Sequence, residues 1–164
     1  MKTIIILLLI IFTANITKSQ NNYVRSNEKI IYKFKTKKNK ILVIAGDTSN
    51  KYIVYRYGTK NNIELEYPKD YSKSWDKFKY SYYMRGGVNN GRELVYLYFI
   101  NGNYKYVTYS EYYSEDGSTY CGIKLVNTKT NKIIDIEGDS KTIEGSLSDL
   151  TDNEKINMTN DISF

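Results

Sequence analysis

Apolar residues alternate with polar ones along most of this chain, and this period of two restricts its fold more than any other feature. In segment 29–35, KIIYKFK, the side chains of Ile30, Tyr32 and Phe34 share one face and lysines occupy the other. Similar strand-like segments recur along the rest of the chain, among them 62–67, 93–100, 104–113, 132–137 and 141–147. Because successive side chains of a strand point to opposite faces, the pattern predicts strands rather than helices.

Turn-forming residues separate these segments. Asn101-Gly102 supplies the positive φ of a tight hairpin turn between 93–100 and 104–113, and residues 127–131 join the next two segments in a looser hairpin. Pro68, the only proline, ends segment 62–67, and residues 71–78 form an irregular or short helical link that carries Trp75. The spacing predicts an all-β fold: a single antiparallel β-sandwich or small β-barrel of eight or nine strands.

The N-terminus has the layout of a secretory signal peptide. Lys2 precedes an apolar run from Ile4 to Phe12, and Thr17 and Ser19 are the small residues before a cleavage point at Gln20. The run is shorter than a membrane-spanning helix, so we expect cleavage, export to the periplasm or medium, and no membrane insertion afterwards. The predicted organisation is a signal peptide at 1–19, a β domain at 20–150 and a polar C-terminal tail at 151–164.

The composition excludes several partners and chemistries. Removing residues 1–19 lowers the basic side chains from 24 to 22 against 18 acidic ones, a net charge of +4 that is too mild to indicate a nucleic-acid partner. The chain has no histidine and one cysteine, which excludes histidine-based catalytic pairs, histidine zinc sites and an intramolecular disulfide. We therefore expect a monomer that is not an enzyme and needs no cofactor. Cys121, in a strand-like run, is expected to be a buried small hydrophobe rather than a reactive thiol.

Tyrosine is abundant, with 18 residues in the chain. It suits strands because its ring packs while its hydroxyl remains solvated, so the first interpretation is structural. Within 104–113 the tyrosines change parity, which indicates either a bulge or aromatic residues on both faces. The functional hypothesis is a surface that recognises a protein or a cell-envelope glycan. Its candidate residues are Trp75, Tyr71 and Tyr83, together with Tyr109 and Tyr113 of the Asn101 hairpin.

Other charged groups suggest alternative functions. Glu64 and Glu66 share a strand face and allow a carboxylate-based hydrolase, although an exposed strand face shows the same alternation. Asp135, Glu137 and Asp139 are potential calcium ligands without the usual loop spacing. Five lysines between 33 and 40 form a basic patch that suits an anionic surface or protects a strand edge. The alternating C-terminus, which ends in Phe164, resembles the closing strand of a small outer-membrane β-barrel, so an envelope structural protein is the main alternative.

Residues 55–150 also resemble uncharacterised small exported β proteins of bacteria. The segments that carry this resemblance are IELEYPKDYSKSWDKFKYSYYMRGG, LYFINGNYKYVTYSEYY and IEGSLSDL. The resemblance implies an exported β domain and brings no activity with it. The layout is similar in architecture alone to the periplasmic lysozyme inhibitors, because their signature loop is absent and Cys121 cannot form an internal disulfide.

Overall fold

The structure is a computed structural model that describes residues 23–87 and 90–160. The predicted signal peptide and the last four residues lie outside the described ranges. The described chain is all-β, with two short 3₁₀ helices, η1 (Ser74–Lys77) and η2 (Leu147–Leu150). Neither of these helices is long and apolar enough to cross a membrane. The strands are β1 (Glu28–Thr36), β2 (Ile41–Asp47), β3 (Ile53–Thr59), β4 (Asn62–Tyr67), β5 (Lys79–Arg85), β6 (Arg92–Asn101), β7 (Tyr104–Tyr113), β8 (Ser118–Asn127), β9 (Ile133–Gly145) and β10 (Asn157–Met158).

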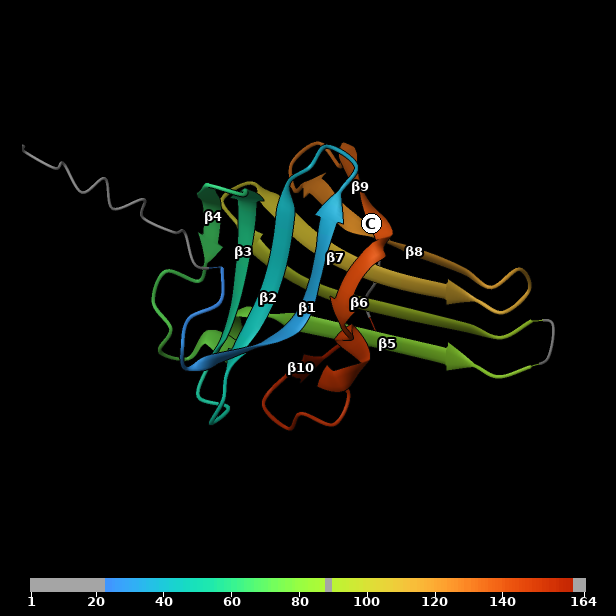
Figure 1. Cartoon of the computed structure of the whole chain (residues 1–164), viewed down its shortest axis with the longest axis horizontal. Helices are drawn as coiled ribbons and strands as arrows, with labels where there is room; N and C mark the ends of the chain where they lie inside the picture. The colour runs from blue at the N-terminus through green and yellow to red at the C-terminus, as the bar shows by residue number, and fades with distance from the viewer. Residues whose placement is uncertain (1–22, 88–89, 161–164) are drawn as a thin grey trace, which may run out of the picture.

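All ten described strands belong to one curled sheet in the order β10-β5-β6-β7-β8-β9-β1-β2-β3-β4. Every neighbouring pair is antiparallel except β10 and β5, which are parallel. The direction of β1–β4 crosses that of β5–β8 (Figure 1), so the sheet folds over itself and encloses its inner face. The all-β class is thus confirmed, in one curled sheet of ten described strands rather than eight or nine.

Strand β9 makes the corner between the two halves of the sheet. Its first residues, Ile133–Glu137, pair with β8, whereas residues from Gly138 to Gly145 lie beside β1. A Cβ atom on Gly138 would lie 2.4 Å from Sγ of Cys121 and 2.7 Å from the ring of Phe34, so this position has no room for a side chain. The sequence segments 132–137 and 141–147, expected as separate strands, are largely parts of this one long strand.

The main core fills the inner face. Side chains from both halves meet there, and η2 and the segment after it add Leu147, Leu150 and Ile156. Tyr32 and Phe34 are buried as the alternation predicts. Ile31 replaces Ile30 in this core because the β1–β2 register shifts between Ile30 and Tyr32. A bulge adds one residue to a strand and so changes which side chain points inward.

The two hairpins predicted from the turns are confirmed. β6 and β7 pair from Arg92↔Tyr113 to Asn101↔Tyr104, and Gly102 has a φ of 61° in the turn. Neither the β6–β7 nor the β7–β8 ladder has a register shift. The parity change in 104–113 therefore reflects aromatic residues on both faces of β7, the second of the two alternatives.

Candidate functional site: a tyrosine-lined outer face and a notch

The outer face of β5–β8 is the candidate site because it is rich in tyrosine and exposed at one end. Cross-strand pairs place Tyr83, Leu94, Glu111 and Tyr120 side by side in one row. The adjacent row holds Arg85, Arg92, Tyr113 and Ser118, and the row on the other side holds Ser81, Tyr96, Tyr109 and Gly122. We call these three rows the outer tyrosine face.

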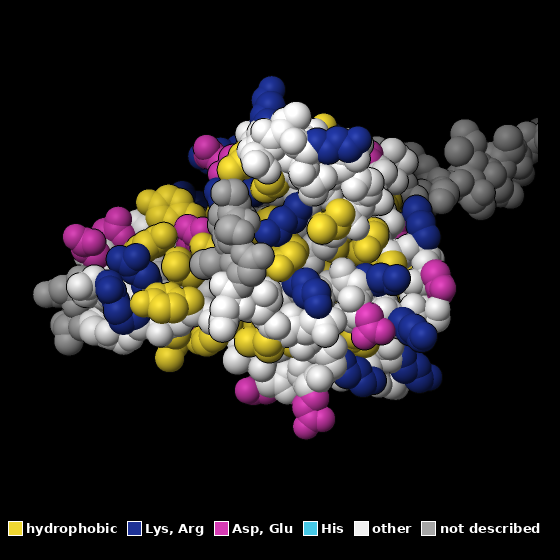
Figure 2. Space-filling view, turned by 180° about the vertical axis from the view of Figure 1, so that it is seen from behind, with side chains coloured by type: hydrophobic (Ala, Val, Ile, Leu, Met, Phe, Trp, Pro, Cys, Tyr) yellow, Lys and Arg dark blue, Asp and Glu magenta, His cyan; other side chains and the backbone are white. Residues whose placement is uncertain are grey.

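One end of this face projects from the rest of the molecule. The ends of β5–β8 near the 114–117 turn reach beyond the other strands at the right of Figure 1. Seen from behind in Figure 2, hydrophobic side chains gather over this end, with basic and acidic side chains beside them. Tyr120 is 53% exposed and Tyr83 is 44% exposed, whereas Tyr96 and Tyr109 are buried. The projecting end thus exposes aromatic surface.

Glu111 organises the tyrosines of the projecting end. Its carboxylate accepts hydrogen bonds from the hydroxyls of Tyr96, at 2.9 Å, and Tyr113, at 3.2 Å. The guanidinium carbon of Arg92 lies 5.6 Å from the centre of the Tyr113 ring, which is a cation–π contact. The Tyr120 ring meets the Tyr113 ring edge-on at 6.0 Å. These contacts hold the rings of Tyr96, Tyr113 and Tyr120 against neighbouring groups of the sheet.

The electrostatic setting keeps these phenols protonated. Burial, followed by the nearby Glu111 carboxylate, raises the pKa values of Tyr96 and Tyr113. Burial and then Asp135 raise the pKa of Tyr109, whose hydroxyl donates to Oδ1 of Asp135 at 3.1 Å. The hydroxyls of Tyr96, Tyr109 and Tyr113 are therefore neutral hydrogen-bond donors near neutral pH.

A notch opens in the outer face where β9 turns away from β8. The β8–β9 ladder reaches Gly122↔Glu137 and stops, although β8 continues back to Ser118 along β7. Among the described strands, none pairs with Ser118–Tyr120 on the side that faces β9, and Gly138 of β9 lies beside Cys121. A cavity of about 450 Å³ lies here, and the side chains that line it include Lys37, Tyr109, Glu111, Tyr120, Lys124, Asp135 and Glu137. A free strand edge thus borders a polar and aromatic groove.

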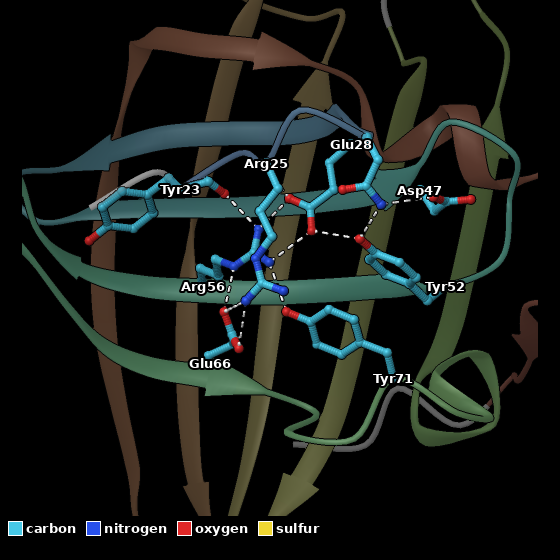
Figure 3. A network of polar contacts seen from close by, with 9 residues as sticks. Tyr23, Arg25, Glu28, Asp47, Tyr52, Arg56, Glu66 and Tyr71 are labelled. Atoms are coloured by element: carbon cyan, nitrogen blue, oxygen red, sulfur yellow. Dashed lines mark hydrogen bonds and ion pairs between the residues drawn. The ribbon is translucent and has the colours of Figure 1, made fainter. Parts of the chain in front are cut away.

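Of the residues predicted for binding, Tyr83, Tyr109 and Tyr113 lie on the outer tyrosine face, and Tyr71 and Trp75 do not. Tyr71 lies over the outer face of β1–β4, where it belongs to a polar network centred on Arg56 (Figure 3). Its ring packs against Tyr52 at 4.5 Å, and its hydroxyl accepts a hydrogen bond of 2.8 Å from Nη2 of Arg56. The structure therefore does not assemble Trp75, Tyr71 and Tyr83 into one platform.

Arg56 is fully buried and is the centre of that network. Its guanidinium donates to both carboxylate oxygens of Glu28, at 2.6 and 2.8 Å, and to Oε2 of Glu66 at 2.7 Å. A further bond of 2.8 Å reaches the carbonyl oxygen of Tyr23. With Tyr71, these acceptors use all five N–H groups of the guanidinium. The network fastens the segment before β1 to the sheet and leaves Arg56 no donor for a ligand.

Trp75 lies in the core, with 6% of its surface exposed. Its indole N–H donates to the carbonyl oxygen of Asn50 at 3.3 Å, and Lys155 donates to the same oxygen at 2.8 Å. Part of Trp75 also lines a pocket of about 550 Å³, together with Asp47, Asp149 and other polar residues. These two hydrogen bonds to Asn50 join Trp75 and the C-terminal segment to the β2–β3 turn, so Trp75 has a structural role.

Four of the other carboxylates singled out in the sequence are engaged in ion pairs. Glu64 pairs with Lys40 at 2.6 Å, and Glu66 pairs with Arg56. Asp135 pairs with Lys124 at 2.8 Å, and Glu137 pairs with Lys37. Within residues 23–87 and 90–160, no group of three or more acidic or cysteine side chains is arranged to hold a metal ion.

Cys121 is buried on the inner face, beside Gly138. Burial raises the pKa of its thiol to about 11, so it stays protonated near neutral pH. The expectation of a buried small hydrophobe describes this environment.

Tyr120, Arg92 and Glu111 were not identified from the sequence. Tyr120 has the parity of Gly122 and Lys124, the polar positions of its strand, and this parity was the signal that it faces outward. The contributions of Arg92 and Glu111 depend on strand pairing, which the sequence does not reveal. No family model, curated protein or solved structure matches this chain.

Proposed function

We propose that this protein is exported and acts as a non-catalytic binding protein that recognises a partner protein through the projecting end of its outer tyrosine face. The observation that carries the proposal is the clustering of exposed Tyr83 and Tyr120 with Tyr113 and Arg92 on one uncovered surface. Tyrosine and arginine are the residue types that most often dominate binding energy at protein interfaces. Preorganised rings with adjacent charges provide both apolar contact and orientation.

Several features support binding rather than catalysis. The titratable groups of this face are ion-paired carboxylates, a carboxylate that accepts two phenols, and phenols whose pKa values are raised. The raised pKa values of Tyr96 and Tyr109 keep these two phenols protonated near neutral pH, which disfavours them as general bases. In this proposal the mature chain begins at Gln20, is monomeric in the periplasm or medium, needs no cofactor, and binds neither nucleic acid nor the membrane interior.

The second candidate is a cell-envelope glycan in place of a protein. The notch beside Tyr120 favours it, because the cavity of about 450 Å³ combines aromatic rings with carboxylates and lysines that can hydrogen-bond to hydroxyl groups. Pockets of this size that combine apolar walls with a few placed polar groups are typical of small-ligand sites. The experiment below separates the two.

The test is affinity capture with immobilised residues 20–164 at low and high salt. An extract of envelope and secreted proteins is passed over the protein, followed by purified peptidoglycan. The double variant Tyr83→Ser with Tyr120→Ser removes the exposed rings, and Tyr104→Ser is the matched control, because Tyr104 is 38% exposed at the opposite end of β7.

We expect one protein to be retained at high salt by the wild type and by Tyr104→Ser, and lost by the double variant. Retention of peptidoglycan with the same dependence on Tyr83 and Tyr120 would assign the glycan instead. Retention that is equal for all three chains would overturn the proposed surface.

A further inference from the structure

The free edge of β8 suggests how the partner binds. Strand β8 pairs with β7 along its whole length, but β9 accompanies it only from Gly122 onward. In a β-ladder, alternate residues direct their N–H and C=O groups to opposite sides of the strand. Asn127 donates its N–H to Lys132 at the β9 side of β8, so by alternation Thr119 directs its backbone groups into the notch. The open segment, Ser118–Tyr120, has a length of about 10 Å at the usual strand rise.

An unpaired edge of this kind is a template for another strand. Proteins commonly protect such edges with lysines, bulges or covering segments. Here the notch has lysines on its rim, Lys37 and Lys124, but each is held by a carboxylate, Lys37 by Glu137 and Lys124 by Asp135. The edge itself borders a cavity of about 450 Å³. An extended peptide laid against β8 would complete the ladder that β9 leaves open.

The charges of the notch indicate which side chain the incoming strand would carry. Of its three carboxylates, Asp135 and Glu137 each pair with a lysine, whereas the described partners of Glu111 are two tyrosine hydroxyls. Glu111 lies directly across from Tyr120 in the β7–β8 ladder. A cationic side chain placed over the exposed Tyr120 ring would gain a cation–π contact and the charge of Glu111.

We propose that the notch binds an extended peptide segment of the partner protein, which adds as a strand to the free edge of β8 and directs an arginine or lysine onto Tyr120 and Glu111. This inference rests on the proposed function and specifies its binding mode. Main-chain hydrogen bonds supply affinity in this type of recognition, and the alternate side chains supply specificity.

The test uses a defined probe, the peptide acetyl-Thr-Val-Arg-Val-Thr-amide, first with the wild-type protein and then with two variants at Glu111 and Glu115. Two N-methylated versions are compared, one methylated at the amides that would face β8 and one at the amides that would face away. Binding is followed at millimolar peptide by the backbone amide signals of Thr119–Cys121 in nuclear magnetic resonance and by their hydrogen exchange. A peptide with glutamate in place of arginine tests the charge preference.

We expect the unmodified probe to shift these amide signals and slow their exchange, and methylation on the side that faces β8 to weaken binding by about tenfold or more, because each lost hydrogen bond to an otherwise unpaired group is costly. Methylation on the opposite side should change affinity little, and glutamate should abolish binding. Glu111→Gln should reduce the preference for arginine, whereas Glu115→Gln, in the exposed turn, should not.

Equal effects of the two methylations, or no response of Thr119–Cys121 to the arginine probe, would overturn strand addition. The failure of this inference is distinguishable from failure of the proposed function. Capture that depends on Tyr83 and Tyr120 with no protection of Thr119–Cys121 in the complex would retain the outer tyrosine face and reject the notch as a strand acceptor.

Discussion

Replacing Arg56 with methionine should destabilise this protein more than any exposed substitution. Arg56 and the Glu28 side chain are both fully inaccessible to solvent, and two hydrogen bonds of 2.6 and 2.8 Å join them. Without Arg56, Glu28 would keep two neutral donors, the backbone N–H of Arg25 at 2.8 Å and the hydroxyl of Tyr52 at 3.0 Å, but no cation. Leaving a buried charge uncompensated costs about 3–5 kcal/mol.

The assay is urea unfolding at pH 7, followed through the fluorescence of Trp75, the only tryptophan. A loss of about 3–5 kcal/mol is a large part of the roughly 5–15 kcal/mol that stabilises a typical domain. Arg85→Met, at the exposed end of β5, is the matched control and should change the free energy of unfolding by less than about 0.5 kcal/mol. Adding Glu28→Gln to Arg56→Met should recover part of the loss, because it removes the stranded charge.

The pH dependence provides a second check on the same network. Burial alone would raise the pKa values of Glu28 and Glu66, but the hydrogen bonds and charge of Arg56 hold both below their ordinary range. Both carboxylates therefore stabilise the fold above the unfolded pKa of about 4.3, and this contribution is lost as the pH falls through the folded values. In Arg56→Met, Glu28 stays buried but has lost its cation, so its pKa should rise. Protonation of Glu28 at acid pH should then remove the free-energy cost of its buried charge.

The difference in stability between wild type and Arg56→Met should therefore shrink from pH 7 towards pH 4. A loss below about 1 kcal/mol would refute the reasoning, because removal of one partner from a buried pair normally costs several times more. A loss that is the same at both pH values would also refute it, since the cost would then not come from an ionised carboxylate.

Three further predictions concern the inner face. Tyr32→Phe should leave stability unchanged or raise it by about 1 kcal/mol in urea unfolding, because the buried Tyr32 hydroxyl forms no hydrogen bond of normal geometry within the described residues and only lies near Ser110 and Cys121. A clear loss of stability would show that one of these contacts satisfies the hydroxyl. Gly138→Ala should lower the free energy of unfolding by about 1–3 kcal/mol, because the Cβ of the alanine would meet Cys121 and Phe34. An unchanged urea midpoint would contradict the packing at the β9 corner. Cys121 should react with a thiol reagent at pH 7 only as fast as the protein unfolds, because the thiol is buried and burial raises its pKa to about 11. Rapid labelling of the folded protein would contradict the burial of Cys121.

Local sequence signals were reliable where one short segment contains the whole cause. The hairpin at Asn101-Gly102 follows from the positive φ that glycine adopts at low cost, and the structure has Gly102 at 61°. The link at 71–78, expected to be irregular or a short helix, contains the 3₁₀ helix η1. The burial of Tyr32 and Phe34 follows from alternation alone.

Other features depend on which strands become neighbours. Alternation does not reveal a bulge, so Ile31 was not expected to replace Ile30 in the core. The corner of β9 depends on Cys121 and Phe34 approaching Gly138 from other strands. The aromatic platform of Trp75, Tyr71 and Tyr83 was expected from proximity in sequence, but burial in the core and the bond to Arg56 place Trp75 and Tyr71 elsewhere.

The sequence by itself determined that this chain folds into strands and at which residues its tight hairpins turn. It also determined that the chain has no histidine chemistry and no internal disulfide. Periodicity, turn geometry and composition are local or additive properties, so they can be read without the tertiary structure. Only the tertiary structure decided which tyrosines share an exposed face, that Glu111 ties two of them together, and that β9 leaves the edge of β8 unpaired. These features arise from register and from the curl of the sheet, which bring residues distant in the chain into contact.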